Sequence, residues 1–218
     1  MATRCFSVVR GKRVRVTELD ACGVPVTGGS FVVSEGFIQV ALTSELEDGD
    51  EYIQKNADGK LCINERAPDA LKRLNVTVDW CQVDPDIISL ITGYPVELDG
   101  SDSVGFRIQE GEADKRWALE VWTGLGGASC NGGSVEYGYM LLPHITGSTL
   151  GDITIENANA TFQTTGYTEG GSGWGVGPYN VIGSPPGPLE VPISAVDHAL
   201  IRVTEVAPPD AVCGAQVL

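Results

Sequence analysis

Short apolar runs that alternate with polar residues dominate the chain. Val14 and Val16 alternate with charged and hydroxyl residues within residues 8–17, and residues 71–83 show the same alternation. A period of two is typical of a strand with one buried face. Further segments of this kind lie at 31–43, 104–109, 117–123, 134–142, 152–165 and 198–206. The pattern predicts about eight strands, separated by turns that contain glycine and proline.

One short helix is predicted, at about residues 85–92. Asp84 is placed to cap its amino end, Pro85 suits the first helical position, and Gly93 can end it. The apolar residues between them fall on one helical face, so the helix is expected to lie on a sheet.

These elements predict a mainly β fold. With 218 residues and no internal repeat, the chain is long enough for one well-packed domain, expected to span residues 1–218. We expect a β-sandwich or barrel of two packed sheets with a short flanking α-helix.

Residues 44–60 differ from their neighbours because they are densely acidic and end in a strong turn signal at 56–59. The acids of the first part are Glu45, Glu47, Asp48, Asp50 and Glu51. We expect a projecting hairpin or loop, and loops of this length usually contact a partner or are mobile. A solvated acidic loop without a partner remains the alternative.

The charge balance narrows the function. The formal net charge is −15, and a surface of that sign repels double-stranded DNA, which argues against a conventional DNA-binding role. The basic residues are uneven, and five of them lie in the first fifteen positions. They are Arg4, Arg10, Lys12, Arg13 and Arg15.

Nothing in the sequence predicts export or a membrane helix. Residues 1–15 are basic but contain no apolar segment, and no run approaches about 18 apolar residues. We therefore expect folding in the cytoplasm, with reduced and mostly buried thiols, although disulfides formed after release from a cell remain possible. The six widely spaced cysteines are Cys5, Cys22, Cys62, Cys81, Cys130 and Cys213.

No catalytic, metal or cofactor motif emerges. His144 and His198 are the only histidines, no G-x-S-x-G elbow is present, and both histidines are expected to be structural. The acidic run at 48–50 lacks the spacing of a calcium loop, and no C-x-x-C pair is present. The sequence therefore predicts no catalytic, cofactor or metal residues and favours a protein that is not an enzyme.

Several segments, in a fixed order, resemble the major tail proteins of long-tailed phages that infect actinobacteria. The segments are Asp84-Pro85 through Thr92-Gly93, Trp117 through Gly124, Tyr137 through Pro143, Gly147 through Asn157, Trp174 through Tyr179, and Ala207-Pro208-Pro209. The resemblance runs through most of the chain, and its specificity lies in the order of the segments.

This resemblance implies a tail tube subunit. Six copies would close a ring, rings would stack into a hollow tube, and the phage genome would pass through the lumen without specific binding. The expected partners are further copies of the chain and other phage tail proteins, and the expected location is the virion tail, after synthesis and assembly in the bacterial host cytoplasm. Such proteins carry no catalytic or cofactor residues.

The residues give physical reasons for such a role. Six chains of charge −15 would carry −90 per ring, and an acidic lumen would keep DNA from adhering. A cyclic ring also turns exposed sheet edges into interfaces. Complementary charge predicts that the acidic loop, with Glu45, Glu47, Asp48, Asp50 and Glu51, meets the basic strand of another subunit. The basic residues expected at this contact are Arg10, Arg13 and Arg15.

Two alternatives remain open. Another virion component, such as a capsid decoration protein or a connector-ring subunit, would have a similar composition. A carbohydrate-binding β-sandwich could use its tryptophans as a platform for sugars. Trp117 and Trp122 are five positions apart, so on one regular strand they should face opposite sides, and at least one should be in the core.

Overall fold

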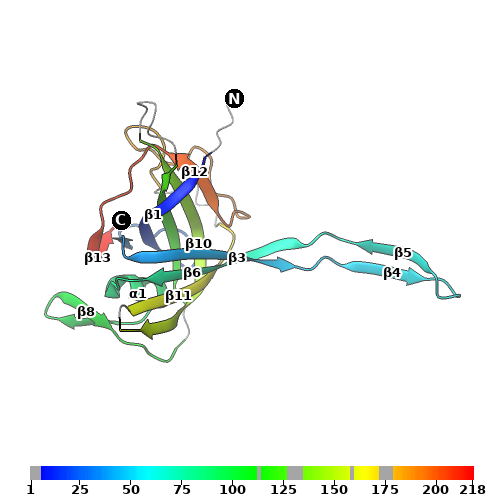
Figure 1. The fold of residues 1–218 in the computed structure, drawn as a ribbon. Coiled ribbons are helices and arrows are strands. Elements are labelled where there is room, and N and C mark those ends of the chain that lie inside the picture. The colour runs from blue at the N-terminus through cyan, green and yellow to red at the C-terminus, as the bar shows by residue number, and fades with distance from the viewer. Residues whose placement is uncertain (1–5, 112–113, 127–134, 158–159, 172–178) are drawn as a thin grey trace.

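The structure, a computed structural model, describes residues 6–111, 114–126, 135–157, 160–171 and 179–218. Strands make up 58% of it and helix 4%. The sheets are antiparallel and one short helix flanks them, which confirms the predicted mainly β fold (Figure 1).

The helix is α1 (Pro85–Thr92). The strands of the described residues are β1 (Val8–Leu19), β2 (Ser30–Ser34), β3 (Phe37–Glu47), β4 (Glu51–Lys55), β5 (Leu61–Arg66), β6 (Ala70–Trp80), β7 (Val96–Asp99), β8 (Asp102–Phe106), β9 (Arg116–Leu125), β10 (Tyr137–Ile155), β11 (Ala160–Thr168), β12 (Leu200–Thr204) and β13 (Val212–Val217).

Nine strands form one antiparallel sheet in the order β13-β2-β1-β9-β10-β11-β6-β3, and β12 pairs with β10. The long strand β10 connects two parts of this sheet. Its first part, to Ile145, pairs with β9, and its second part, from Ile145, pairs with β11. Register shifts and a left-handed Gly147 (φ 60°) interrupt β10 near this change of partner. The two parts of the sheet therefore act as separate layers.

The main core lies between these layers. Val14 and Val121 from β1 and β9 belong to the same buried cluster as Val78 and Trp80 from β6, although these strands are not neighbours in the sheet. A second cluster lies on the other face of β1 and β9, beneath residues 179–193. Because successive side chains of a strand point to opposite faces, alternate residues of β1 and β9 pack into two different cores.

The predicted helix is confirmed with its caps. A carboxylate oxygen of Asp84 accepts a hydrogen bond from the backbone N–H of Asp86 (2.9 Å), and Gly93 ends the helix with φ 79°. Ile87 and Ile91 are buried in the main core, so α1 packs against the sheet as its sequence indicates.

The prediction of one strand over 31–43 is wrong. The segment forms β2 in one layer and β3 in the other, and the chain crosses between them at Gly36. The Gly36 carbonyl accepts from the backbone N–H groups of Cys81 (2.9 Å) and Gln82 (3.1 Å). A Cβ at Gly36 would lie 2.4 Å from the Gln82 Cβ, so this close crossing requires glycine.

The prediction for 152–165 is also wrong in its boundaries. Those positions hold the end of β10 and the start of β11. Strands β5, β7 and β13 have no counterpart among the predicted strands, whereas β4 lies within the hairpin or loop predicted at 44–60.

The prediction of mostly buried thiols is wrong for the cysteines that the structure describes. Cys22, Cys62, Cys81 and Cys213 are free and exposed, because they lie in turns or on strands without a second covering layer. Cys5 and Cys130 lie outside the described residues.

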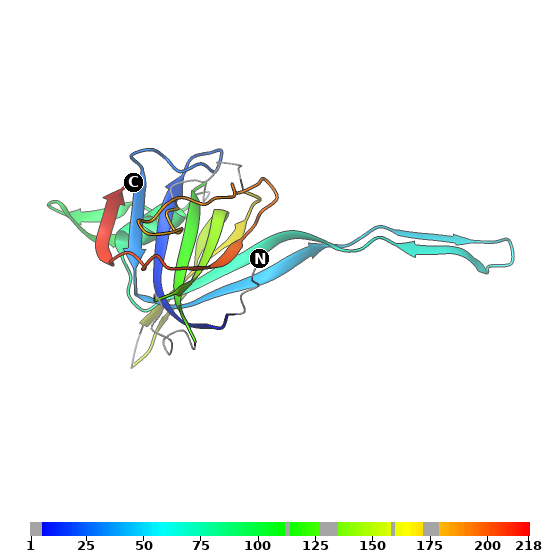
Figure 2. The same cartoon turned by 90° about the horizontal axis from the view of Figure 1, so that it is seen from above.

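Among the described residues, no helix has the length and apolar character needed to cross a membrane. The most distinctive feature of the outline is a ribbon formed by the continuation of β3 and β6. It runs far out from the body and ends in β4 and β5, as both views show (Figures 1 and 2).

Candidate functional site

The candidate site is this ribbon, here called the arm and defined as residues 44–73. The acidic segment predicted to project at 44–60 is its outgoing half and its turn, and residues 61–73 return alongside it. None of the buried core residues of the described chain lies in the arm. The arm therefore adds little to the stability of the body and is available for other contacts.

The arm presents apolar side chains to solvent. Tyr52 and Leu61 are 61% and 58% exposed. Ile53 and Ile63 beside them are exposed as well, as are Leu46 and Leu71, which pair directly across the ladder closer to the body. A lone two-stranded ribbon is marginally stable in water, and its open edges invite pairing with another chain.

A well-bonded turn closes the tip of the arm. The side-chain oxygen of Asn56 accepts from the backbone N–H groups of Asp58 (3.0 Å) and Lys60 (2.8 Å), and Gly59 adopts φ 78°. The turn predicted at 56–59 is confirmed.

A polar junction joins the outer ladder to the inner one. Asp69 accepts from the backbone N–H of Gly49 (3.0 Å) and from Arg66 (2.9 Å). The hydrogen bond from Gly49, followed by the charge of Arg66, lowers the pKa of Asp69 below its usual value. A Cβ at Gly49 would lie 1.9 Å from the carbonyl oxygen of Ala67, so the two chains approach closely here.

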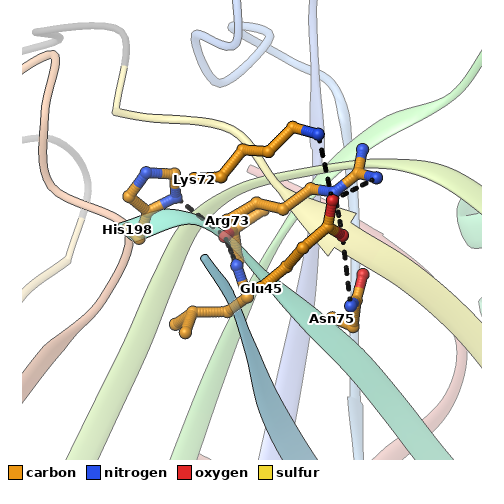
Figure 3. A network of polar contacts seen from close by, with 7 residues as sticks. Glu45, Lys72, Arg73, Asn75 and His198 are labelled. Carbon is orange, nitrogen blue, oxygen red and sulfur yellow. Dashed lines mark hydrogen bonds and ion pairs between the residues drawn. The ribbon is translucent and has the colours of Figure 1, made fainter. Parts of the chain in front are cut away.

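Paired charges fix the root of the arm (Figure 3). Arg73 makes a bidentate contact with Glu45, at 2.6 and 3.0 Å, and the Lys72 ammonium lies 3.1 Å from the same carboxylate. These hydrogen bonds, from Arg73 first and Lys72 second, lower the pKa of Glu45 to about 2. Asn75 completes the group at 3.5 Å. The arrangement ties the outgoing strand to the returning one.

The root also contacts the neighbouring strand of the body. The Arg73 guanidinium lies 4.5 Å from the ring centroid of Tyr167, a favourable cation–π geometry. The backbone N–H of Leu74 donates to the Thr168 hydroxyl (2.9 Å), which lies 2.8 Å from Nδ1 of His198. These contacts fix the direction in which the arm leaves the body relative to β11.

The predicted acidic contact residues divide into two groups. Glu45 is paired with Arg73 at the root of the arm, and Asp48 lies 3.6 Å from Arg66 within the arm. Glu47, Asp50 and Glu51 are exposed and form no ion pair with any residue that the structure describes. The last three therefore remain available to an outside partner.

The predicted basic contact residues also separate. Arg10 is exposed at the start of β1, and Arg13 pairs with Glu35 at 2.7 Å. Arg15 lies on the covered face of β1, where its guanidinium bonds to Glu120, with one contact at 2.8 Å. Because Arg15 lies beneath the second core, its charge belongs to the interior and not to a surface patch.

The sequence signals considered for catalysis lie apart from one another. The His144 ring is buried and its Nε2 lies 3.6 Å from a Glu169 carboxylate oxygen, whereas His198 contacts Thr168. Across the described residues, no group of three or more His, Cys, Asp or Glu side chains could hold a metal ion.

Three tryptophans serve the cores. Trp80 and Trp117 are buried in the main core and Trp122 in the second one, which confirms that Trp117 and Trp122 face opposite sides. Trp174 lies outside the described residues. The three described tryptophans therefore offer no surface platform for a sugar.

Sequence reasoning found the acidic half of the arm but not the side chains that complete it. Lys72 and Arg73 lie in what the pattern indicated only as the start of a strand, and the exposed apolar residues of β4 and β5 resemble core positions in sequence. The available signal was the turn at 56–59, which could have placed residues 61–73 beside 44–55.

Comparison with protein-family models and with curated proteins gives no match to this chain. Its function is therefore inferred from the geometry of the body and the arm.

Proposed function

We propose that the protein is a structural virion protein, a phage tail tube subunit whose arm joins copies of the chain into rings and a hollow tube. The observation that carries the proposal is the arm itself. It projects from a compact β body, exposes apolar residues such as Tyr52 and Leu61, and contributes nothing to the described core. An element of this kind is stabilised when a partner covers it.

The distribution of charge supports the same proposal. A chain of charge −15 suits the wall of a passage for DNA, because a wall of like charge does not retain the moving molecule. The resemblance of the ordered segments to actinobacteriophage major tail proteins adds the expectation of six copies per ring. In this proposal the protein acts by geometry alone, without a catalytic residue or a cofactor.

Native mass spectrometry of the purified protein, at increasing concentration, tests the proposal. We expect particles of six chains of 23.0 kDa each, and multiples of that particle, because rings stack. A protein that stays monomeric at every concentration, or that forms only dimers, would contradict the proposal. A connector ring would give one closed ring size that does not stack.

A further inference from the structure

An apolar groove of about 420 Å³ opens on the body, and its lining residues lie outside the arm. Residues of five strands line it, and most of its lining is apolar. They include Val8, Ile38, Val40, Met140 and Ile201. Ile38 and Ile201, at its rim, are 53% and 60% exposed. Apolar surface of this kind on a protein body typically marks a binding site.

The local backbone builds this groove. Strand β1 is irregular where it passes the groove, with register shifts on both sides of Gly11 and a positive φ of 37° at Arg10. A Cβ at Gly11 would lie 2.4 Å from Cζ of Phe37, so the Phe37 ring packs directly against the backbone. The glycine and the irregular strand hold the wall of the groove in place.

The chain cannot fill its own groove with its own arm. Val40 lines the groove and Tyr52 lies near the arm tip, twelve residues further along the ribbon. At about 3.3 Å per residue the ribbon carries the tip roughly 40 Å away. The paired root at Glu45 and Arg73 fixes the direction of departure. The arm that the structure describes therefore cannot cover the groove of its own chain.

Charge and chemistry match the groove to the arm of a second copy. Arg10 and Lys12 flank Gly11 at the groove wall, and they form no ion pair with any described residue. Glu47, Asp50 and Glu51 of the arm likewise form no ion pair within the described chain, whereas the Lys12 ammonium already lies 4.7 Å from the ring centroid of Tyr137. An arm that places apolar residues in the groove can bring these carboxylates toward the basic residues beside it.

We infer that the groove between β1, β3 and β12 receives the apolar tip of the arm of a second copy of this chain. The contact is heterologous, because one copy gives its arm and the other its groove, so it repeats from copy to copy. The inference rests on the proposed function, since it names the partner surface of the same arm.

Two complementary variants test the inference. The groove variant carries Ile38→Arg and Ile201→Arg and keeps its arm. The arm variant replaces residues 48–69 by a two-residue Asn-Gly turn between Glu47 and Ala70, which pair directly in the ladder, and it keeps its groove. The substituted side chains are exposed and the deleted residues lie outside the core, so both proteins should fold.

Sedimentation velocity measures the result. Each variant alone should stay at monomer mass, at concentrations where the unmodified chain assembles. Their mixture should form a 1:1 complex that grows no further, because only one arm and one groove remain. A control with Ile155→Arg and Val191→Arg, two exposed positions outside both the groove and the arm, should assemble like the unmodified chain.

The possible failures are distinguishable. If the unmodified chain assembles but the mixture stays monomeric, the arm does not dock in this groove, and the proposed function stands. Assembly of the groove variant alone would equally overturn the inference and would leave the groove to another occupant, such as a small apolar ligand. If the unmodified chain itself never assembles, both the inference and the proposed function fail.

Discussion

At the scale of single residues, the most consequential charge in the body is the fully buried carboxylate of Glu120. Arg15 bonds to it, and the Tyr139 hydroxyl donates to it at 2.7 Å. Burial is the largest single effect and lowers the pKa of Arg15, but the charge and the hydrogen bond of Glu120, with smaller effects of Tyr139 and Tyr179, together outweigh it and the pKa rises. Burial first, and Glu120 second, raise the pKa of Tyr139. The buried Glu120 carboxylate is tolerated because Arg15 balances its charge and the Tyr139 hydroxyl donates a hydrogen bond to it.

We predict that Glu120→Gln destabilises the body by about 3 kcal/mol, because it leaves the Arg15 guanidinium beneath the second core without its counter-charge. Urea denaturation followed by tryptophan fluorescence measures the change. Arg66→Gln, which removes an exposed pair of the arm, serves as the control and should change the free energy of unfolding by less than about 1 kcal/mol. An equal effect of the two substitutions would contradict this account of the second core.

The root of the arm has a pH dependence of known sign. The pKa of Glu45 in the folded protein, about 2, is below its ordinary value of 4.5, so its contribution is complete above about pH 4.5 and is lost as the pH falls toward 2. NMR titration of the Glu45 carboxyl measures this pKa. Arg73→Ala should return it toward the ordinary range, and Arg66→Ala should leave it low. A Glu45 pKa near 4.5 in the unmodified protein would show that the root contact is not formed in solution.

Some single-residue features follow from sequence because their causes are local. Asp84 and Gly93 cap α1 as their positions predict. The role of Arg15 could not be predicted in this way, because its partner is 105 positions away and only the pairing of β1 with β9 brings them together. The alternation along β1 identifies the face that carries Arg15 but not whether a second layer covers that face.

At the scale of elements, the arm combines weak internal support with a firm attachment. Its outer ladder, β4 with β5, has no covering layer among the described residues, whereas its inner ladder continues β3 and β6 of the body. Polar contacts at Asp69 and Glu45 hold the junction and the root. A ribbon built in this way keeps its direction while its tip opens easily, so it can adapt to a partner surface.

We predict that backbone amides of residues 51–66 exchange hydrogen rapidly in the monomer, because a two-stranded ladder without a core opens at little cost. Assembly should slow their exchange, since a neighbouring copy covers the tip. Hydrogen exchange with mass spectrometry compares the two states, and β9, which is buried on both faces, gives the slow reference in each. Arm amides as slow as those of β9 in the monomer, or unchanged on assembly, would contradict the role given to the arm.

Elements, like single residues, can be predicted from sequence where their causes are local and not where they depend on contacts between distant strands. The period-two pattern of β1, β6 and β9 identifies strands because one face of each is apolar and the other more polar or charged. It does not show where residues 31–43 divide, because the break at Gly36 depends on a contact with Gln82 from another strand. It also misses β4 and β5, whose apolar residues have no core to face in the single chain.

At the scale of the whole molecule, body and arm have separate tasks. The body contains two cores, and none of the described core residues lies in the arm. The arm carries apolar side chains that are exposed to solvent in the single chain. Deleting only residues 45–58 would leave the returning strand β5 without its partner. Removing residues 48–69 takes both strands of the tip together and leaves Glu47 paired with Ala70. This matched deletion separates folding from assembly.

For the variant that lacks residues 48–69, we predict a free energy of unfolding within about 1 kcal/mol of the full chain, because no deleted residue is in a core and shortening a loop has a small effect. Thermal or urea unfolding of the monomeric protein measures this. A variant that is unfolded or strongly destabilised would show that the arm supports the body, contrary to the division of tasks inferred from the burial pattern.

The central claim is that the arm joins copies of the chain into rings that stack. Negative-stain electron microscopy of the full chain and of the variant lacking residues 48–69, prepared side by side at high concentration, tests it most directly. The account predicts hexameric rings or hollow tubes from the full chain and only monomers from the variant. Tubes from both proteins, or monomers from both, would contradict it.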